Sequence, residues 1–147
     1  MEHCTVHLVS WHDGEPLLRA VREEVFMREQ GVPAELEWDG LDEICRHVLA
    51  LSKHGDAIGC GRITPRIDGA EAHIGRIAVL PEWRGKQVGS AMLETLLEYA
   101  YSRHYPQVEL NAQTQAIEFY RRFGFTELGE VFMDANMPHI SMQLRLE

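Results

Sequence analysis

The stretch IGRIAVLPEWRGKQVGSAMLETLLEYA, from Ile74 to Ala100, decides which fold we expect for this chain. Its apolar run at 77–80 ends at Pro81, which lacks the amide hydrogen that a sheet ladder needs. A basic loop with two glycines follows at 84–90. Apolar residues then recur at helical spacing, namely Val88, Met92, Leu96 and Tyr99. The pattern predicts a strand, a glycine-containing loop and an amphipathic helix in direct succession.

A loop of this kind is suited to holding phosphate. The first amides of a helix have no partner within the helix and carry the positive end of its dipole. Glycines let an anion approach the backbone closely, and Arg84 and Lys86 add positive charge. The loop is neither a Walker A sequence nor a GxGxxG dinucleotide fingerprint. Taken alone, the stretch could also be a surface turn followed by a core helix.

The loop resembles the acyl-CoA-binding motif of the GNAT superfamily of N-acetyltransferases, Q/R-x-x-G-x-G/A. Arg84 and Gly89 match its two ends, and Gln87 stands where the central glycine usually is. A second motif of the superfamily, N-x-x-A-x-x-F/L-Y-x-x-x-G-F/Y, resembles QTQAIEFYRRFGF at 113–125, which departs only at Gln113 and keeps an amide there. The segments 21–33, 110–116 and 134–139 look like a branch of small bacterial single-domain GNAT proteins. The resemblance implies one N-acetyltransferase domain over 1–147.

The remaining patterns agree with the GNAT fold, an α/β (α+β) architecture. The resemblance implies a mixed central sheet of about six to seven strands, flanking helices and a βαβ acyl-CoA-binding unit. Alternation and turn residues predict strands at 5–9, 47–51, 57–64, 71–80, 107–110, 126–133 and 140–146. Helices are expected from a start at 13–16 to Gly31, at 88–102 and at 116–122, with a loop at 134–138.

Two features of the predicted sheet concern the site. Gly59 and Gly61 lie inside one strand and indicate a bulge or the close approach of another group. Regular alternation at 71–80 would place one set of residues on a single face of the sheet: His73, Gly75, Ile77 and Val79.

Composition limits the possible functions. The 147 residues are 45% hydrophobic and 25% charged, as in a globular domain, and contain neither a membrane-spanning apolar run nor a secretory signal. Three cysteines without CxxC spacing suggest reduced thiols in the cytoplasm, and the eight histidines show no complete metal-ligand spacing, so we expect no metal. A net charge of −9 argues against nucleic acid and is compatible with small amines as partners. Either a monomer or a homodimer is compatible with the sequence.

The resemblance implies acetyl-CoA as the donor and assigns residues to its binding. The loop would hold the pyrophosphate, and the backbone of 77–79 would pair with pantetheine as an extra strand. Asn111 and Gln113 would bond the pantetheine arm, although either could instead cap a helix or lie in a loop. The donor-binding residues expected are Ile77, Ala78, Val79, Arg84, Gly85, Lys86, Gln87, Val88, Gly89, Ser90, Asn111, Gln113 and Tyr120.

Acyl transfer to an amine also needs a base and an acid. Tyr120 is the candidate acid for the departing thiolate, with a core aromatic as the alternative. Glu23, His73 and His139 are candidates for the base, unless water relays the proton. Arg22, Glu23 and His139 are the expected acceptor-binding residues, although a plain surface role for Arg22 is the simpler interpretation.

The acidic segment AELEWDGLDE at 34–43 allows two interpretations. It is either a solvated loop or short helix with apolar anchors, or a wall of the acceptor site that favours cations. For the whole chain there are likewise two hypotheses. One is an acetyl-CoA-dependent N-acetyltransferase acting on a small, cationic amine, which the retained Tyr120 favours. The other is a non-catalytic acyl-CoA-binding module, which Gln87 in the loop favours.

Overall fold

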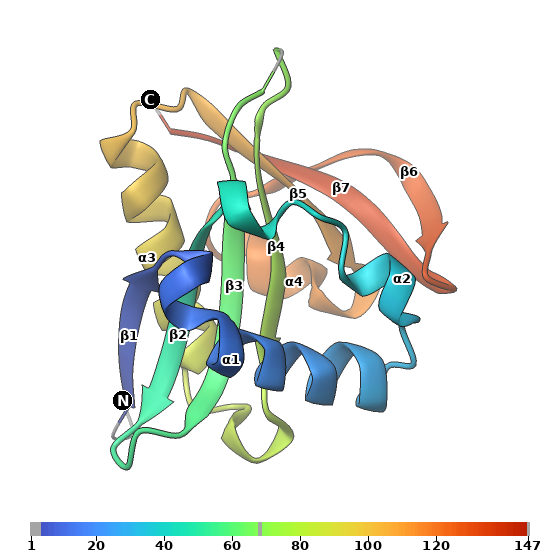
Figure 1. Cartoon of the computed structure of the whole chain (residues 1–147). Coiled ribbons are helices and arrows are strands. Elements are labelled where there is room, and N and C mark those ends of the chain that lie inside the picture. The colour runs from blue at the N-terminus through green and yellow to red at the C-terminus, as the bar shows by residue number, and fades with distance from the viewer. Residues whose placement is uncertain (1–3, 68, 147) are drawn as a thin grey trace.

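A single seven-stranded sheet with helices on both faces forms the protein in the computed structural model, which describes residues 4–67 and 69–146 (Figure 1). In chain order the elements are β1 (Cys4–Val9), α1 (Trp11–Arg22), η1 (Glu23–Glu29), α2 (Ala34–Glu37), η2 (Asp42–Ile44), β2 (Arg46–Ser52), β3 (Ala57–Thr64), β4 (Ala72–Val79), η3 (Pro81–Trp83), α3 (Val88–Ser102), β5 (Gln107–Gln113), η4 (Thr114–Ala116), α4 (Ile117–Arg121), β6 (Thr126–Asp134) and β7 (Met137–Arg145). The strand order is β1-β2-β3-β4-β5-β7-β6.

The sheet is mixed. β1 to β4 form an antiparallel meander, β4 and β5 are parallel neighbours joined through α3, and β7 pairs antiparallel with both β5 and β6. The parallel pair requires a long crossover, which α3 supplies. The expected GNAT architecture is therefore confirmed, including the βαβ unit.

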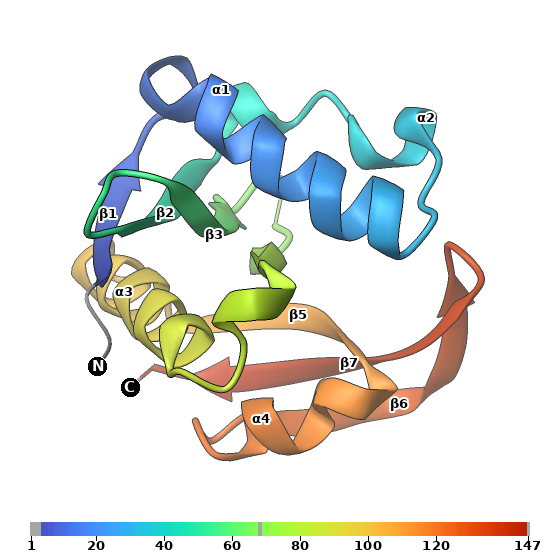
Figure 2. The ribbon, with the colours of Figure 1, turned by 90° about the horizontal axis from the view of Figure 1, so that it is seen from below.

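Two apolar layers enclose the first half of the sheet. α1 packs on one face and α3 on the other, as the view from below shows (Figure 2). The alternation of β2 reflects this, because Val48 and Ala50 join the core under α3 whereas Leu49 joins the core under α1.

Glycine in β3 allows α3 to pack closely against the sheet. A Cβ atom at Gly59 would lie 2.9 Å from Cε of Met92, and one at Gly61 would lie 3.3 Å from Cδ1 of Leu96, both on α3. The expectation of a close approach at these glycines is confirmed, since a side chain at Gly59 would collide with Met92 and one at Gly61 would crowd Leu96.

β4 carries a bulge that changes the phase of its side chains. Cys60 pairs with Ala78 but Arg62 pairs with Gly75, so Arg76 is the extra residue, and its φ is +55°. Consequently Ile74 before the bulge packs into the same core as Ile77 and Val79 after it. The expectation that His73, Gly75, Ile77 and Val79 share one face is wrong, because the bulge interrupts the alternation.

Several element boundaries also differ from those expected. α1 begins at Trp11 instead of 13–16, because the Oγ of Ser10 accepts a hydrogen bond from the amide of Asp13 and caps the helix. In place of the expected loop at 134–138 there is a tight turn at Ala135 and Asn136, both with positive φ. These two residues alone separate the end of β6 from the start of β7.

Six buried or half-buried charges form a closed ring that ties the segment 37–42 to α1 and the sheet. Arg22 bonds Glu37 and Asp42, each at 2.7 Å, and Arg62 bonds Asp42 at 2.8 Å. Arg62 also bonds Asp39, and Arg76 closes the ring to Asp39 and Glu37 at 3.4 and 3.1 Å. The members alternate in sign: Arg22, Glu37, Arg76, Asp39, Arg62 and Asp42.

The short-helix interpretation of the acidic segment fits the structure best. Ala34–Glu37 form α2, most of the segment is exposed, and Trp38 packs against the core under α1, while Glu37 and Asp42 are buried. The ring neutralises Glu37, Asp39 and Asp42, so these three carboxylates form no cation-attracting wall. Burial alone would raise the pKa of Asp39, but the hydrogen bond and charge of Arg62 outweigh it and lower that pKa to about 2.

Removing one carboxylate from the ring should destabilise the fold strongly. In Asp42→Asn, Arg22 and Arg62 lose the charge that they share, while both guanidinium groups stay buried. The expected loss is about 3 kcal/mol of unfolding free energy, in the range for breaking a buried pair. Urea unfolding of the two proteins measures it.

A matched control is Glu24→Gln, which breaks the exposed Glu24–Arg28 pair on η1. Exposed pairs four residues apart contribute about 0.3–0.5 kcal/mol. Equal losses in Asp42→Asn and Glu24→Gln would show that the ring is not a stabilising element.

Candidate active site

The site begins where β4 and β5 separate. The two strands pair only over Ala72–Ile74 and Val108–Leu110. Beyond these residues β4 keeps its partner β3 and β5 keeps its partner β7, while the edges of β4 and β5 that face each other lose their ladder. Backbone groups of β4 are thereby left available between the strands.

The hydrogen bonds between β3 and β4 show which β4 residues point their amide and carbonyl groups into the gap. The amide of Leu80 donates to Ile58 at 2.9 Å, so in this antiparallel pair the alternate residue Ala78 also points toward β3. Ile77 and Val79 then point toward the gap, and the carbonyl of Val79 indeed accepts from Nε of Arg84 at 2.9 Å. Of the three residues expected to pair with pantetheine, Ile77 and Val79 face the gap and Ala78 faces β3.

The N-terminus of α3 opens onto the same gap. No side chain caps this 15-residue helix and its first turn carries no acid. The amide of Ala91 is the first to bond back into the helix, to the carbonyl of Gln87 at 3.1 Å. The amides of 88–90 precede it and remain outside the helical ladder, which suits an anion.

A donor-side cavity of about 560 Å³ connects these features. Most of the expected donor-binding residues line it, namely Ile77, Ala78, Val79, Arg84, Gly85, Gln87, Val88, Gly89, Ser90 and Tyr120. Lys86 does not, because its exposed side chain lies outside the cavity lining. Asn111 and Gln113 line a second cavity instead.

Arg84 is held by the protein rather than left open to a ligand. Its NH1 and NH2 groups bond both carboxylate oxygens of Glu29, at 2.8 and 2.7 Å. This hydrogen-bonded pair lowers the pKa of Glu29 and raises that of Arg84. Arg84, the residue expected to bind phosphate, therefore lines the cavity, but its guanidinium group is already bonded to Glu29.

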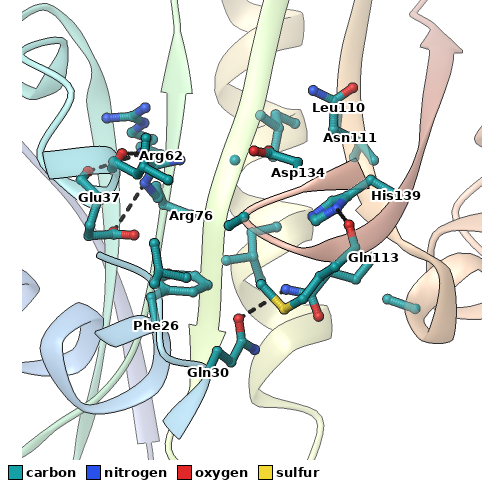
Figure 3. Close-up of a pocket in the computed structure, with 18 of the residues that line it drawn as sticks. Phe26, Gln30, Glu37, Arg62, Arg76, Leu110, Asn111, Gln113, Asp134 and His139 are labelled. Atoms are coloured by element: carbon teal, nitrogen blue, oxygen red, sulfur yellow. Dashed lines mark hydrogen bonds and ion pairs between the residues drawn. The ribbon is translucent and has the colours of Figure 1, made fainter. Parts of the chain in front are cut away.

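The second cavity, of about 350 Å³, lies on the other side of the gap (Figure 3). Glu37, Arg62 and Arg76 of the charge ring form one wall, and Asp134 and His139 stand on the opposite side. Asp134 makes no ion pair with any residue in 4–67 or 69–146. We call this the acceptor-side cavity.

Both candidate histidines line the acceptor-side cavity. Nδ1 of His139 lies 2.8 Å from the carbonyl of Met137, so Nδ1 carries a hydrogen, and in the neutral tautomer Nε2 is the nitrogen with the lone pair. Burial, followed by the charges of Arg62 and Arg76, lowers the pKa of His73. The ring thus disfavours a protonated His73.

Tyr120 lies where the cavities meet. Four residues line both of them: Gln30, Ile77, Ala116 and Tyr120. Edge-to-face contacts with Phe119 and Phe125, at 5.1 and 5.9 Å between ring centroids, fix the phenol ring. Burial raises the pKa of Tyr120 to about 12, so its hydroxyl stays protonated at neutral pH.

Two expected acceptor-binding residues lie elsewhere. Glu23 is exposed and lines neither cavity. Arg22 is buried, and its guanidinium is shared between Glu37 and Asp42, so neither the acceptor role nor the surface role fits it.

Among the lining residues that were not anticipated from the sequence, three have polar side chains that matter below. Glu29 is the last residue of η1, Gln30 is its C-cap, and Asp134 is the last residue of β6. In the sequence, the first two only marked the end of a helix and the third fell in an expected loop. Their approach to the gap depends on tertiary packing.

The chain was compared with known protein families. The family model described as "Acetyltransferase (GNAT) family" matches residues 10–125. This chain belongs to the GNAT family. The family carries out acyl transfer, which agrees with the two connected cavities.

Relatives cover most of the chain. It is 38% identical over 123 residues to "Uncharacterized N-acetyltransferase YjcF" of Bacillus subtilis (strain 168), covering 83% of this chain and 86% of that protein. It is 34% identical over 129 residues to "Protein ElaA" of Escherichia coli (strain K12), covering 85% and 83%. The crystal structure of an acyl-CoA N-acyltransferase from Pseudomonas aeruginosa has a TM-score of 0.85 at 28% identity, covering 95% of this GNAT chain and 98% of that one.

No helix within residues 4–67 and 69–146 of this GNAT domain is long and apolar enough to cross a membrane.

The backbone at Gln87 explains why the motif favours glycine there. Gln87 has a φ of +71°, in the left-handed region, and its side chain is exposed. Gln87→Gly should therefore raise the unfolding free energy by about 0.5–1 kcal/mol, a few degrees in Tm for a domain of this size. Thermal unfolding measures the shift.

The control is Gln115→Gly, which also removes an exposed glutamine side chain but lies at a position without positive φ. It should lower the Tm. A lower Tm for Gln87→Gly as well would show that the backbone at 87 carries no strain.

Proposed function

We propose that this GNAT protein is an acetyl-CoA-dependent N-acetyltransferase. It transfers the acetyl group to the amine of a small, cationic acceptor by direct attack on the thioester. The observation that supports this best is the pair of cavities that meet at Tyr120. One ends at the uncapped α3 N-terminus, and the other is lined by the charge ring on one side and by Asp134 and His139 on the opposite side.

The donor-side cavity fits two parts of an acyl-CoA, the pyrophosphate and the pantetheine arm. The amides of 88–90 offer donors to the pyrophosphate at the positive end of α3. Ile77 and Val79 offer backbone groups to the pantetheine amides, as an added strand would require. The thioester would then lie at the junction beside Tyr120, where an open amide of β4 can stabilise the oxyanion.

The chemistry needs one proton removed and one supplied. The amine nitrogen forms a bond to the acetyl carbon, the carbon–sulfur bond breaks, and coenzyme A leaves as the thiol. We assign the base to His139, because in the neutral imidazole whose Nδ1–H bonds the carbonyl of Met137, Nε2 has the lone pair that takes the proton of the amine, whereas burial and the charges of Arg62 and Arg76 lower the pKa of His73. Tyr120 gives its hydroxyl proton to the departing sulfur; solvent then reprotonates Tyr120, and the proton taken by His139 is released to solvent.

Asp134 gives the acceptor its charge preference. It lines the acceptor-side cavity without an arginine partner among the described residues, whereas Glu37 in the same cavity is neutralised by the ring. The net charge of −9 also attracts cations at long range. A second ammonium group of the acceptor would pair with Asp134.

A thiol-release assay with acetyl-CoA tests the proposal over polyamines, aminoglycosides, amino acids and amino sugars. We expect acceptor-dependent release with acceptors that carry a second positive charge, and a lower apparent affinity as salt increases. Asp134→Asn should raise the KM of the best acceptor about tenfold, the loss of one charge-assisted contact.

Glu130→Gln is the matched control, because it removes one carboxylate from the same strand outside both cavities. It should leave KM unchanged. Binding of acetyl-CoA without acceptor-dependent release would support the non-catalytic module instead, and efficient anionic acceptors would contradict the role of Asp134.

Tyr120→Phe isolates the hydroxyl. The ring contacts with Phe119 and Phe125 remain, so the unfolding free energy and the coenzyme A affinity should change little. The turnover number should fall about tenfold to a thousandfold, because a positioned proton donor is lost. Steady-state kinetics and calorimetry on the same preparation separate the two effects. A normal kcat would make Tyr120 a packing residue, and lost affinity with a normal kcat would make it a binding residue.

A further inference from the structure

The guanidinium group of Arg84 bonds a backbone carbonyl that a donor would use and lies in the space that the donor would fill. Its Nε donates to the carbonyl of Val79 at 2.9 Å, and Val79 is one of the two residues whose backbone faces the gap. Its other nitrogens bond both oxygens of Glu29 at 2.8 and 2.7 Å. All three residues line the donor-side cavity, so this guanidinium group crosses the space in which the donor would lie.

The carboxylate that holds Arg84 comes from a rigidly placed helix end. η1 has wide π-helical turns, and the amide of Gln30 donates back to the carbonyl of Val25 at 3.0 Å. The side chain of Gln30 accepts from Nε2 of Gln113 on β5, also at 3.0 Å. The end of η1 therefore bonds to both sides of the gap. Glu29 bonds Arg84 of the loop at 84–90, and Gln30 bonds Gln113 of β5 (Figure 3 shows the second contact).

An entering donor must exchange these bonds for its own. A phosphate group competes with the carboxylate of Glu29 for Arg84, and a pantetheine amide competes with Nε of Arg84 for the carbonyl of Val79. The exchange is feasible because the pair is exposed, with 43% and 38% of the two side chains accessible, and exposed pairs are weak.

We propose that Glu29 is a positioning residue that holds Arg84 across the donor-side cavity and thereby weakens coenzyme A binding. The role rests on the proposed function, since it concerns the same donor site. Glu29 reclaims Arg84 when the product coenzyme A leaves, so it favours release as much as it opposes binding. Its effect is on donor KM and on product inhibition, and it takes no part in the chemical step.

Calorimetric titration with coenzyme A tests this role in four proteins: wild type, Glu29→Gln, Arg84→Gln and the double variant. Glu29→Gln should bind coenzyme A about two- to fivefold more tightly, the range for losing an exposed competing pair. In the Arg84→Gln background the same substitution should have no effect, because the residue through which Glu29 acts is gone. The KM for acetyl-CoA and the inhibition constant of coenzyme A should fall by the same factor, while kcat does not rise.

Glu24→Gln is the control, because it removes one carboxylate from the same helix but outside both cavities. It should leave coenzyme A affinity unchanged. Weaker binding by Glu29→Gln would overturn the proposal, since Glu29 would then prepare Arg84 for phosphate. A gain that persists without Arg84 would also overturn it, in favour of direct charge repulsion. Failure of the wild type to bind coenzyme A would reject the donor site itself, and this role with it.

Discussion

The parallel pairing of β4 with β5 ends after Ile74 and Leu110, and both cavities follow from that separation. A sheet that stayed paired would leave no open backbone group and no space between its strands. The bulge at Arg76 accompanies the separation and reverses the phase of β4, which brings Ile77 and Val79 into position beside the donor-side cavity. The site is therefore built from an interruption of regular sheet structure.

The ring of six charges supports that interruption. Arg76 adopts a left-handed backbone conformation that is unfavourable for a residue with a side chain. Its guanidinium group bonds Glu37, Asp39 and the backbone carbonyl of Leu36, and these contacts hold the bulge in place. The same contacts hold Leu36 and Glu37 in the wall of the acceptor-side cavity. Stability and site geometry thus depend on the same ion pairs.

The two cavities differ in which of their charged groups are paired within the protein and which remain open to a ligand. On the acceptor side the ring is internally neutral, so Asp134 and the imidazoles of His73 and His139 remain to interact with a ligand. On the donor side the loop cation Arg84 is paired with Glu29, and the uncapped amides of α3 remain. Each side therefore presents a limited set of open polar groups, and these groups are the basis of the functional assignment.

The sequence by itself determined the order of the main elements, the limits of α3 and β3, the loop at 84–90 before α3 and the place of Tyr120 on the short helix after β5. These depend on short-range periodicity, glycines and two local motifs, which one stretch of chain can show. Only the tertiary structure decided the role of Arg22, the phase of β4, the pairing of Arg84 with Glu29, and the acceptor-side wall. These depend on partners 15 to 55 residues apart in sequence, as in Arg22–Glu37 and Arg84–Glu29. An arginine shows its charge in a sequence, but whether that charge faces solvent, a ligand or a buried carboxylate depends on which segments the fold brings together.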